Sequence, residues 1–130
     1  MGNRAGGVLA DTSVWIEFFK NKSDAGKRLE GLISGGIVFV CGIVMFELLQ
    51  GVKSETERAA IKSALSGLPH IEMSASLWEK SAQISASLKK DGLTIPLSDI
   101  FIAALAMEHN LAVFTLDKHF EKIPGVKIYK

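Results

Sequence analysis

Ile37-Val38-Phe39-Val40 is the stretch of sequence that decides the fold. β-branched and aromatic residues fill it without alternating polar positions, which is typical of a strand buried on both faces. Residues 42–50 then have the pattern of a helix that ends at Gly51. A buried strand followed at once by a helix is the repeating unit of a parallel sheet.

The same alternation of strand and helix extends along the chain in both directions. Short apolar strands are predicted at 8–10, 70–72, 112–115 and 126–129, and helices at 14–19, 23–34, 54–66, 74–90 and 99–109. We therefore expect an α/β protein, an α/β/α sandwich around a central parallel sheet of four to five strands. Residues 8–130 are predicted to form a single domain, and residues 1–7 a flexible leader or a remnant of cloning.

The composition excludes several classes of protein. Apolar residues make up 48% of the 130 residues and charged residues 22%, values that do not fit a disordered tail. The 15 basic and 14 acidic residues nearly balance, which does not fit a basic nucleic-acid coat protein. The single cysteine, Cys41, supports neither a disulfide framework nor a cysteine zinc site. Because a single thiol suits a reducing compartment, we expect a cytoplasmic protein. We expect no contact to a membrane, because no apolar run approaches the ~20 residues that span one.

Four carboxylates stand out by their positions. Asp11 follows the first predicted strand and Asp117 follows a later one, and ligands of such sheets bind at the carboxyl ends of strands. Glu47 and Asp99 lie in strongly apolar segments with no Lys or Arg within four residues. Acids that converge without basic partners repel each other unless a cation compensates, and oxygen ligands favour Mg²⁺ or Mn²⁺ over zinc. The pattern indicates metal-dependent cleavage of phosphodiester bonds.

Each of these residues also has a simpler interpretation. Asp11 and Asp117 are good helix caps, and Asp99 is an acid in the first turn of a helix, where the helix dipole favours it. Glu47 could occupy an exposed helix position. His119 lies near the predicted site, but a surface position on a helix is the simpler interpretation for it.

Three aromatic residues in the first predicted helix admit more than one role. Trp15, Phe18 and Phe19 could belong to the core, to a dimer interface or to a groove for a partner helix. We expect most of them in the core and one or two at an interface.

Four segments, in order along the chain, resemble the motifs of the PIN-domain family. They are Asp11-Thr12-Ser13, Ile43-x-x-x-Glu47-Leu48-x-x-Gly51, Ser98-Asp99-Ile100-Phe101-Ile102-Ala103-Ala104-Leu105-Ala106 and Thr115-Leu116-Asp117-Lys118-His119-Phe120. Any one of these motifs is weak evidence, whereas the ordered set is quite specific. In the fourth motif some relatives place the acid at the position of His119.

The resemblance implies a metal-dependent endoribonuclease. By position, Asp11, Glu47, Asp99 and Asp117 would hold Mg²⁺ or Mn²⁺, and Thr12, Ser13 and Thr115 would orient the acids or the phosphate. A free-standing PIN domain of this length is most similar to the VapC toxins of type II toxin–antitoxin pairs. Such toxins typically form homodimers, cleave RNA, and are inhibited by a small antitoxin whose tail enters the site.

Other functions stay open at this point. A PIN fold could serve as a non-catalytic binding module, or as an RNA-processing nuclease that is not a toxin. A phosphorelay receiver is disfavoured, because the acidic pair expected after the first strand and the lysine expected after a late strand are absent. Setting the four acids aside leaves ten acidic against 15 basic residues, so the rest of the chain is basic, as RNA binding requires.

Overall fold

The computed structural model describes residues 6–20 and 23–130, so most of the leader predicted at 1–7 lies outside the described residues. The strands are β1 (Val8–Ala10), β2 (Val38–Cys41), β3 (His70–Ile71), β4 (Ala112–Phe114) and β5 (Lys127–Ile128). The helices are α1 (Thr12–Lys20), α2 (Asp24–Ser34), α3 (Gly42–Gln50), α4 (Glu55–Ser66), α5 (Ala75–Lys90), α6 (Leu97–Glu108) and the short 3₁₀-helix η1 (Lys118–Lys122).

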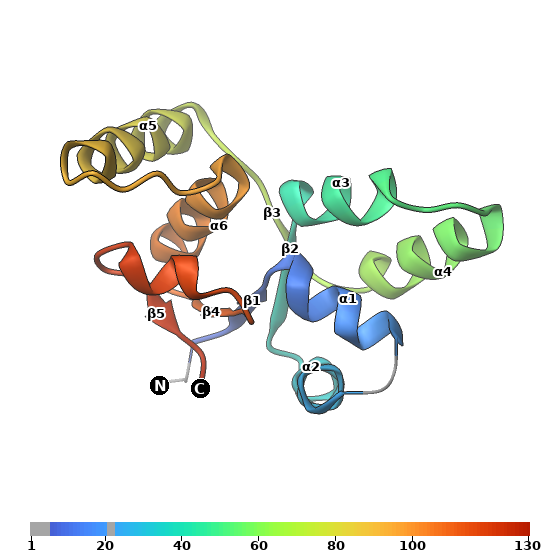
Figure 1. Cartoon of the computed structure of the whole chain (residues 1–130). Helices are drawn as coiled ribbons and strands as arrows, with labels where there is room; N and C mark the ends of the chain where they lie inside the picture. The colour runs from blue at the N-terminus through green and yellow to red at the C-terminus, as the bar shows by residue number, and fades with distance from the viewer. Residues whose placement is uncertain (1–5, 21–22) are drawn as a thin grey trace.

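The strands form one parallel sheet in the order β3-β2-β1-β4-β5. β1 is central, with Val8 paired to Val38 of β2 on one side and to Ala112 of β4 on the other. Helices cover both faces: in Figure 1, α5 and α6 lie above β4 and β5 at the upper left, and α1, α3 and α4 lie to the right of β1 and β2. The predicted α/β/α sandwich is confirmed, with five strands.

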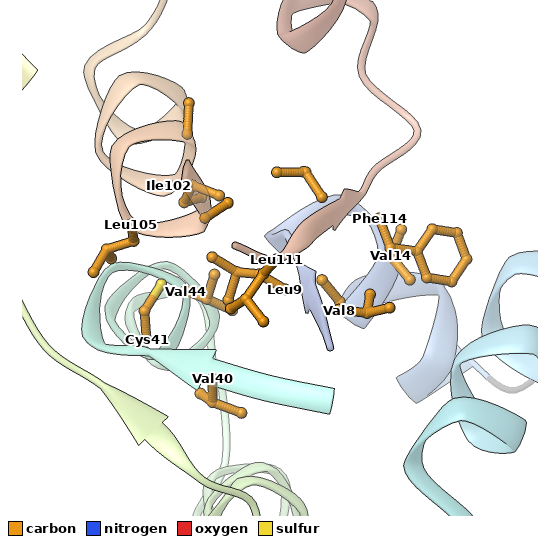
Figure 2. Packing of buried hydrophobic residues seen from close by; sticks show 14 of the residues in the cluster. Val8, Leu9, Val14, Val40, Cys41, Val44, Ile102, Leu105, Leu111 and Phe114 are labelled. Atoms are coloured by element: carbon orange, nitrogen blue, oxygen red, sulfur yellow. The ribbon is translucent and has the colours of Figure 1, made fainter. Parts of the chain in front are cut away.

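The core lies where the sheet meets its helices. Residues of β1 and β4 pack in one cluster with residues of α1, α3 and α6, as the side chains drawn in Figure 2 show. The first predicted helix contributes Trp15, which is fully buried, and Phe18 and Phe19, which are half-buried against the same cluster. The expectation that these aromatics belong mainly to the core is confirmed, and their place at an interface stays a prediction.

The ends of β1 and β4 bring two distant parts of the sequence together. The amide of Asp11 donates to the carbonyl of Phe114 at 3.0 Å, which continues the pairing of the two strands by one residue. α1 starts directly after Asp11, and Thr115 follows β4. The loop after β4 therefore starts beside the first turn of α1.

Among the described residues, no helix is both long and apolar enough to cross a membrane.

Candidate acidic active site

The four acids that the sequence singled out lie around one cavity of about 310 Å³. Its lining comes from the end of β1, α1, α3, the start of α6 and the loop after β4, and comprises Asp11, Thr12, Ser13, Ile16, Glu47, Pro96, Ser98, Asp99, Ile102 and Asp117. Thr115 does not line the cavity but bonds to Asp11. The structure thus brings together side chains that are far apart in the sequence, 104 residues for Asp11 and Thr115.

Asp11 is buried and held by several donors. Its Oδ1 accepts hydrogen bonds from Ser13 Oγ at 2.6 Å and the Val14 amide at 3.3 Å, and its Oδ2 accepts one from Thr115 Oγ1 at 2.5 Å. Burial raises the pKa of Asp11, and the bonds from Ser13 and Thr115 oppose that rise. The bond from Val14 is a helix-capping contact, so Asp11 caps α1 and faces the cavity at the same time.

Two hydroxyl groups also fix the loop after β4 to Asp11. Ser13 Oγ accepts the amide of Leu116 at 3.1 Å, and Thr115 Oγ1 accepts the amide of Asp117 at 2.8 Å. Each hydroxyl therefore donates to Asp11 and accepts from the loop. Asp11 and Asp117 are held in register by these two bridges.

Glu47 is half-buried on α3 and does not point into solvent as a plain surface residue would. Thr12 Oγ1 donates to Glu47 Oε1 at 2.5 Å, which ties α1 to α3 across the mouth of the cavity. The simpler interpretation of Glu47 as an exposed helix position is wrong.

Asp99 and Asp117 face each other from α6 and η1. Asp99 lies in the first turn of α6 and is only 8% exposed. Burial raises the pKa of Asp99, as do the charges of Asp117 and Asp11, while a hydrogen bond from His119 lowers it. Asp117 Oδ1 accepts the amide of His119 at 2.9 Å and so caps η1. Asp117 therefore both caps a helix and belongs to the acidic cluster, as Asp11 does.

His119 is the residue whose role the sequence did not indicate. Its ring Nδ1 lies 3.0 Å from Asp99 Oδ2 and 2.9 Å from Asp117 Oδ1. The side chain is 41% exposed, as expected at a surface, yet its ring faces the two acids. The reason is the tight 3₁₀ turn that Asp117 caps, which directs His119 back toward α6. The spacing Asp-x-His after a strand was the available signal.

The donor set fits a hard divalent cation. Oxygen atoms of Asp99 and Asp117 lie within 4.8 Å of each other, and the His119 ring nitrogen close to them is already occupied by these carboxylates. Carboxylates from Asp11 and Glu47 line the same cavity, with no basic side chain of the described residues among its lining. Such a set of oxygen ligands is one that Mg²⁺ and Mn²⁺ accept.

Comparison with known proteins assigns the chain to a family. The model of the PIN domain matches residues 8–126, and so covers all four acids and the whole sheet up to the start of β5. The chain belongs to the PIN-domain family. Ribonuclease VapC1 of Methanocaldococcus jannaschii is 28% identical to this PIN domain over 125 residues, covering 94% of this chain and 86% of that protein. Ribonuclease VapC11 of Mycobacterium tuberculosis is 26% identical over 124 residues, covering 92% of each.

Solved structures agree with the family assignment. The PIN domain described here superposes with a TM-score of 0.84 on a chain of DNA-bound VapBC from Salmonella typhimurium, at 27% identity, covering 96% of this chain and 98% of that one. A toxin–antitoxin complex from Klebsiella pneumoniae gives a TM-score of 0.76 at 28% identity, covering 92% and 94%.

Proposed function

We propose that this PIN domain is a metal-dependent endoribonuclease and the toxin of a toxin–antitoxin pair. The observation that carries the proposal is the convergence of four carboxylates, from four separate segments, on one cavity. Two of them are buried with a raised pKa, a costly arrangement that no Lys or Arg among the cavity's lining compensates. The relatives named VapC ribonucleases and the VapBC structures support the reaction and the biological setting.

Asp11, Glu47, Asp99 and Asp117 would hold one or two Mg²⁺ or Mn²⁺ ions in the cavity. When bound, such an ion would neutralise charge on the phosphate and make a bound water more acidic, and these four carboxylates would hold it. Thr12 orients Glu47, while Ser13 and Thr115 orient Asp11, so three of the predicted polar residues hold acids by their hydroxyl groups. Because hydroxyl groups add no charge, they fix the carboxylates while leaving them negative for the cation.

Asp117 meets solvent more readily than Asp99, the acid that faces it. Its side chain is 36% exposed, against 11% for that of Asp99. A water molecule entering the cavity therefore meets Asp117 near the surface, and we assign it the positioning of water for in-line attack on phosphorus. In that step the water oxygen bonds to phosphorus and gives up a proton to solvent, while the P–O bond to the ribose oxygen breaks and that oxygen takes a proton from solvent.

RNA cleavage by the purified protein tests this function. We expect internal cuts in defined tRNA, rRNA or mRNA substrates with Mg²⁺, loss of cleavage with EDTA, and loss in Asp99→Asn. Unchanged cleavage by Asp99→Asn would contradict the proposal. A protein that binds Mg²⁺ in calorimetry but cuts none of these RNAs would instead be the non-catalytic binding module.

The toxin role implies a cytoplasmic protein and a small antitoxin partner. A groove of about 310 Å³ between α1, α3 and α4 opens beside the acidic cavity and shares Ile16 and Glu47 with it. Phe19, Leu48 and Val52 give it an apolar floor, which suits an amphipathic antitoxin helix whose tail continues into the cavity. Growth arrest on expression, relieved by the small gene next to this one, distinguishes a toxin from an RNA-processing nuclease.

A homodimer is the third part of the proposal. Phe46 and Leu97 are 65% and 67% exposed and line one hollow with Ile43 and Phe101. Trp78, 51% exposed, packs edge-on against Phe101 with ring centroids 5.0 Å apart and extends the apolar surface over α5. An apolar surface of this kind on a small domain is typical of an interface. We expect Phe46→Glu to lower the molar mass in light scattering from dimer to monomer, with exposed Ala86→Glu as control.

A further inference from the structure

We infer that His119 is the positioning residue for Asp99, and that through Asp99 it sets the affinity of the acidic cavity for Mg²⁺. The inference rests on the proposed function, since it concerns the same metal-binding acids. It assigns a role to the histidine in the Asp-x-His segment after β4, outside the four acids and their hydroxyl partners.

Each acid of the cavity has its own source of hydrogen bonds. Thr12 holds Glu47, three donors hold Asp11, and the amide of His119 holds Asp117. Among the described residues, the only hydrogen-bond donor to Asp99 is the His119 ring, at 3.0 Å. Asp99 is therefore the buried acid whose orientation depends on a single side chain.

The position of His119 is that of a support rather than a ligand. His119 contacts Asp99 and Asp117 but does not line the cavity that these acids enclose. Its Nδ1 hydrogen-bonds to Oδ2 of Asp99 and its backbone amide donates to Oδ1 of Asp117, so the second oxygen of each carboxylate has no donor among the described residues. His119 thus holds one edge of both carboxylates, Asp99 through its ring and Asp117 through its amide, and leaves the opposite oxygens for the cation. Partners of this kind orient metal ligands, and their removal typically costs about 10- to 100-fold in metal affinity or activity.

Calorimetric titration with Mg²⁺ alone, without RNA, tests the inference. We expect His119→Ala to bind Mg²⁺ about 10- to 100-fold more weakly than the unaltered protein. His119→Asn should recover most of that loss, because its side-chain N–H can take the place of Nδ1. His109→Ala is the matched control, since His109 is exposed at the end of α6 and away from the acids.

RNA cleavage gives a second readout that separates positioning from direct catalysis. The deficit of His119→Ala should shrink as Mg²⁺ is raised, while the KM for RNA stays near that of the unaltered protein. A deficit that saturating Mg²⁺ does not relieve would overturn the inference and make His119 a catalytic residue.

Two further results have clear meanings. Equal Mg²⁺ affinity in His119→Ala and the unaltered protein would overturn the inference but leave the proposed nuclease intact. An unaltered protein that neither binds Mg²⁺ nor cuts RNA would instead overturn the proposed function. If His119→Ala unfolds, which circular dichroism would show, His119→Asn and His119→Gln replace it: Asn should bind Mg²⁺ more tightly than Gln, and the reverse order would contradict the inference.

Discussion

The end of β1 and the first turn of α6 each present a buried aspartate to the same cavity, but they hold it in different ways. Asp11 receives a backbone amide and two hydroxyl groups, all from residues next to β1 and β4. Asp99 receives one ring nitrogen from a half-exposed side chain. The position of Asp11 is thus determined by the sheet itself, whereas that of Asp99 depends on a single removable contact.

The largest effect should come from removing either charge. We expect Asp11→Asn and Asp99→Asn each to lower RNA cleavage by more than about 100-fold, because loss of a supporting partner alone costs up to that much. Initial rates at fixed Mg²⁺ measure it, with Asp91→Asn, an exposed acid after α5, as control. A double variant no worse than the single ones would show that the two acids act as a unit. If only one of the two single variants lost RNA cleavage, the other acid would not be needed for the reaction.

Removing one donor from Asp11 should matter less than removing the one donor from Asp99. In Ser13→Ala, Asp11 keeps the Val14 amide and Thr115, so we expect a loss of about tenfold or less, at the lower end for such partners. The same Mg²⁺ titration used for His119→Ala measures it, and Ser87→Ala on the exposed side of α5 is the control. A loss in Ser13→Ala larger than in His119→Ala would reverse the comparison.

The smallest effect should appear in the stability of the metal-free protein. The pKa of Asp99 is raised above its ordinary 3.8, so the folded state binds more protons than the unfolded state above that pH. Stability from this group is therefore lost as pH rises from about 3.8 through the raised value. We expect Asp99→Asn to raise the Tm at neutral pH by a few degrees, about 1 kcal/mol for a domain of this size, and to have no effect well below pH 3.8.

Asp11→Asn sharpens this last comparison. Asp11 is also buried with a raised pKa, but three hydrogen bonds compensate its charge, so we expect a smaller gain in Tm. With Mg²⁺ present, the unaltered protein should instead have a higher Tm than either variant. Mg²⁺ stabilises only a protein that binds it, by about 2.7 kcal/mol at a hundred times the Kd. Thermal scans with and without Mg²⁺ measure both effects. An equal gain in Tm for the two variants would contradict the difference drawn here.

Much of the fold and the acidic cluster could be predicted from the sequence because both follow from simple periodicities. Buried β-branched runs separated by helices require a parallel sheet, and Asp11 and Asp117 lie at strand ends that meet at one edge. Glu47 could be singled out because no Lys or Arg lies within four residues of it in its apolar segment. In the structure its carboxylate accepts a hydrogen bond from Thr12 instead.

The direction of individual side chains could not be predicted in the same way. His119 faces the acids only because Asp117 caps a 3₁₀ turn, whose tighter winding shifts each side chain relative to an α-helix. Trp78 has helical spacing with apolar neighbours, yet it is 51% exposed and packs on Phe101 instead of the core. In both cases the outcome depends on a contact between elements far apart in the sequence.

The central place of β1 in the sheet also determines how the molecule opens. β1 has a partner strand on each side, whereas β3 and β5 are two-residue strands at the edges. Amide hydrogens of β1 therefore exchange with solvent only when the middle of the sheet separates, while the edges exchange through local fraying. Asp11 directly follows this central strand, and His119 lies between β4 and the edge strand β5. Local opening at that edge would release Asp99 from its support while Asp11 stays in place.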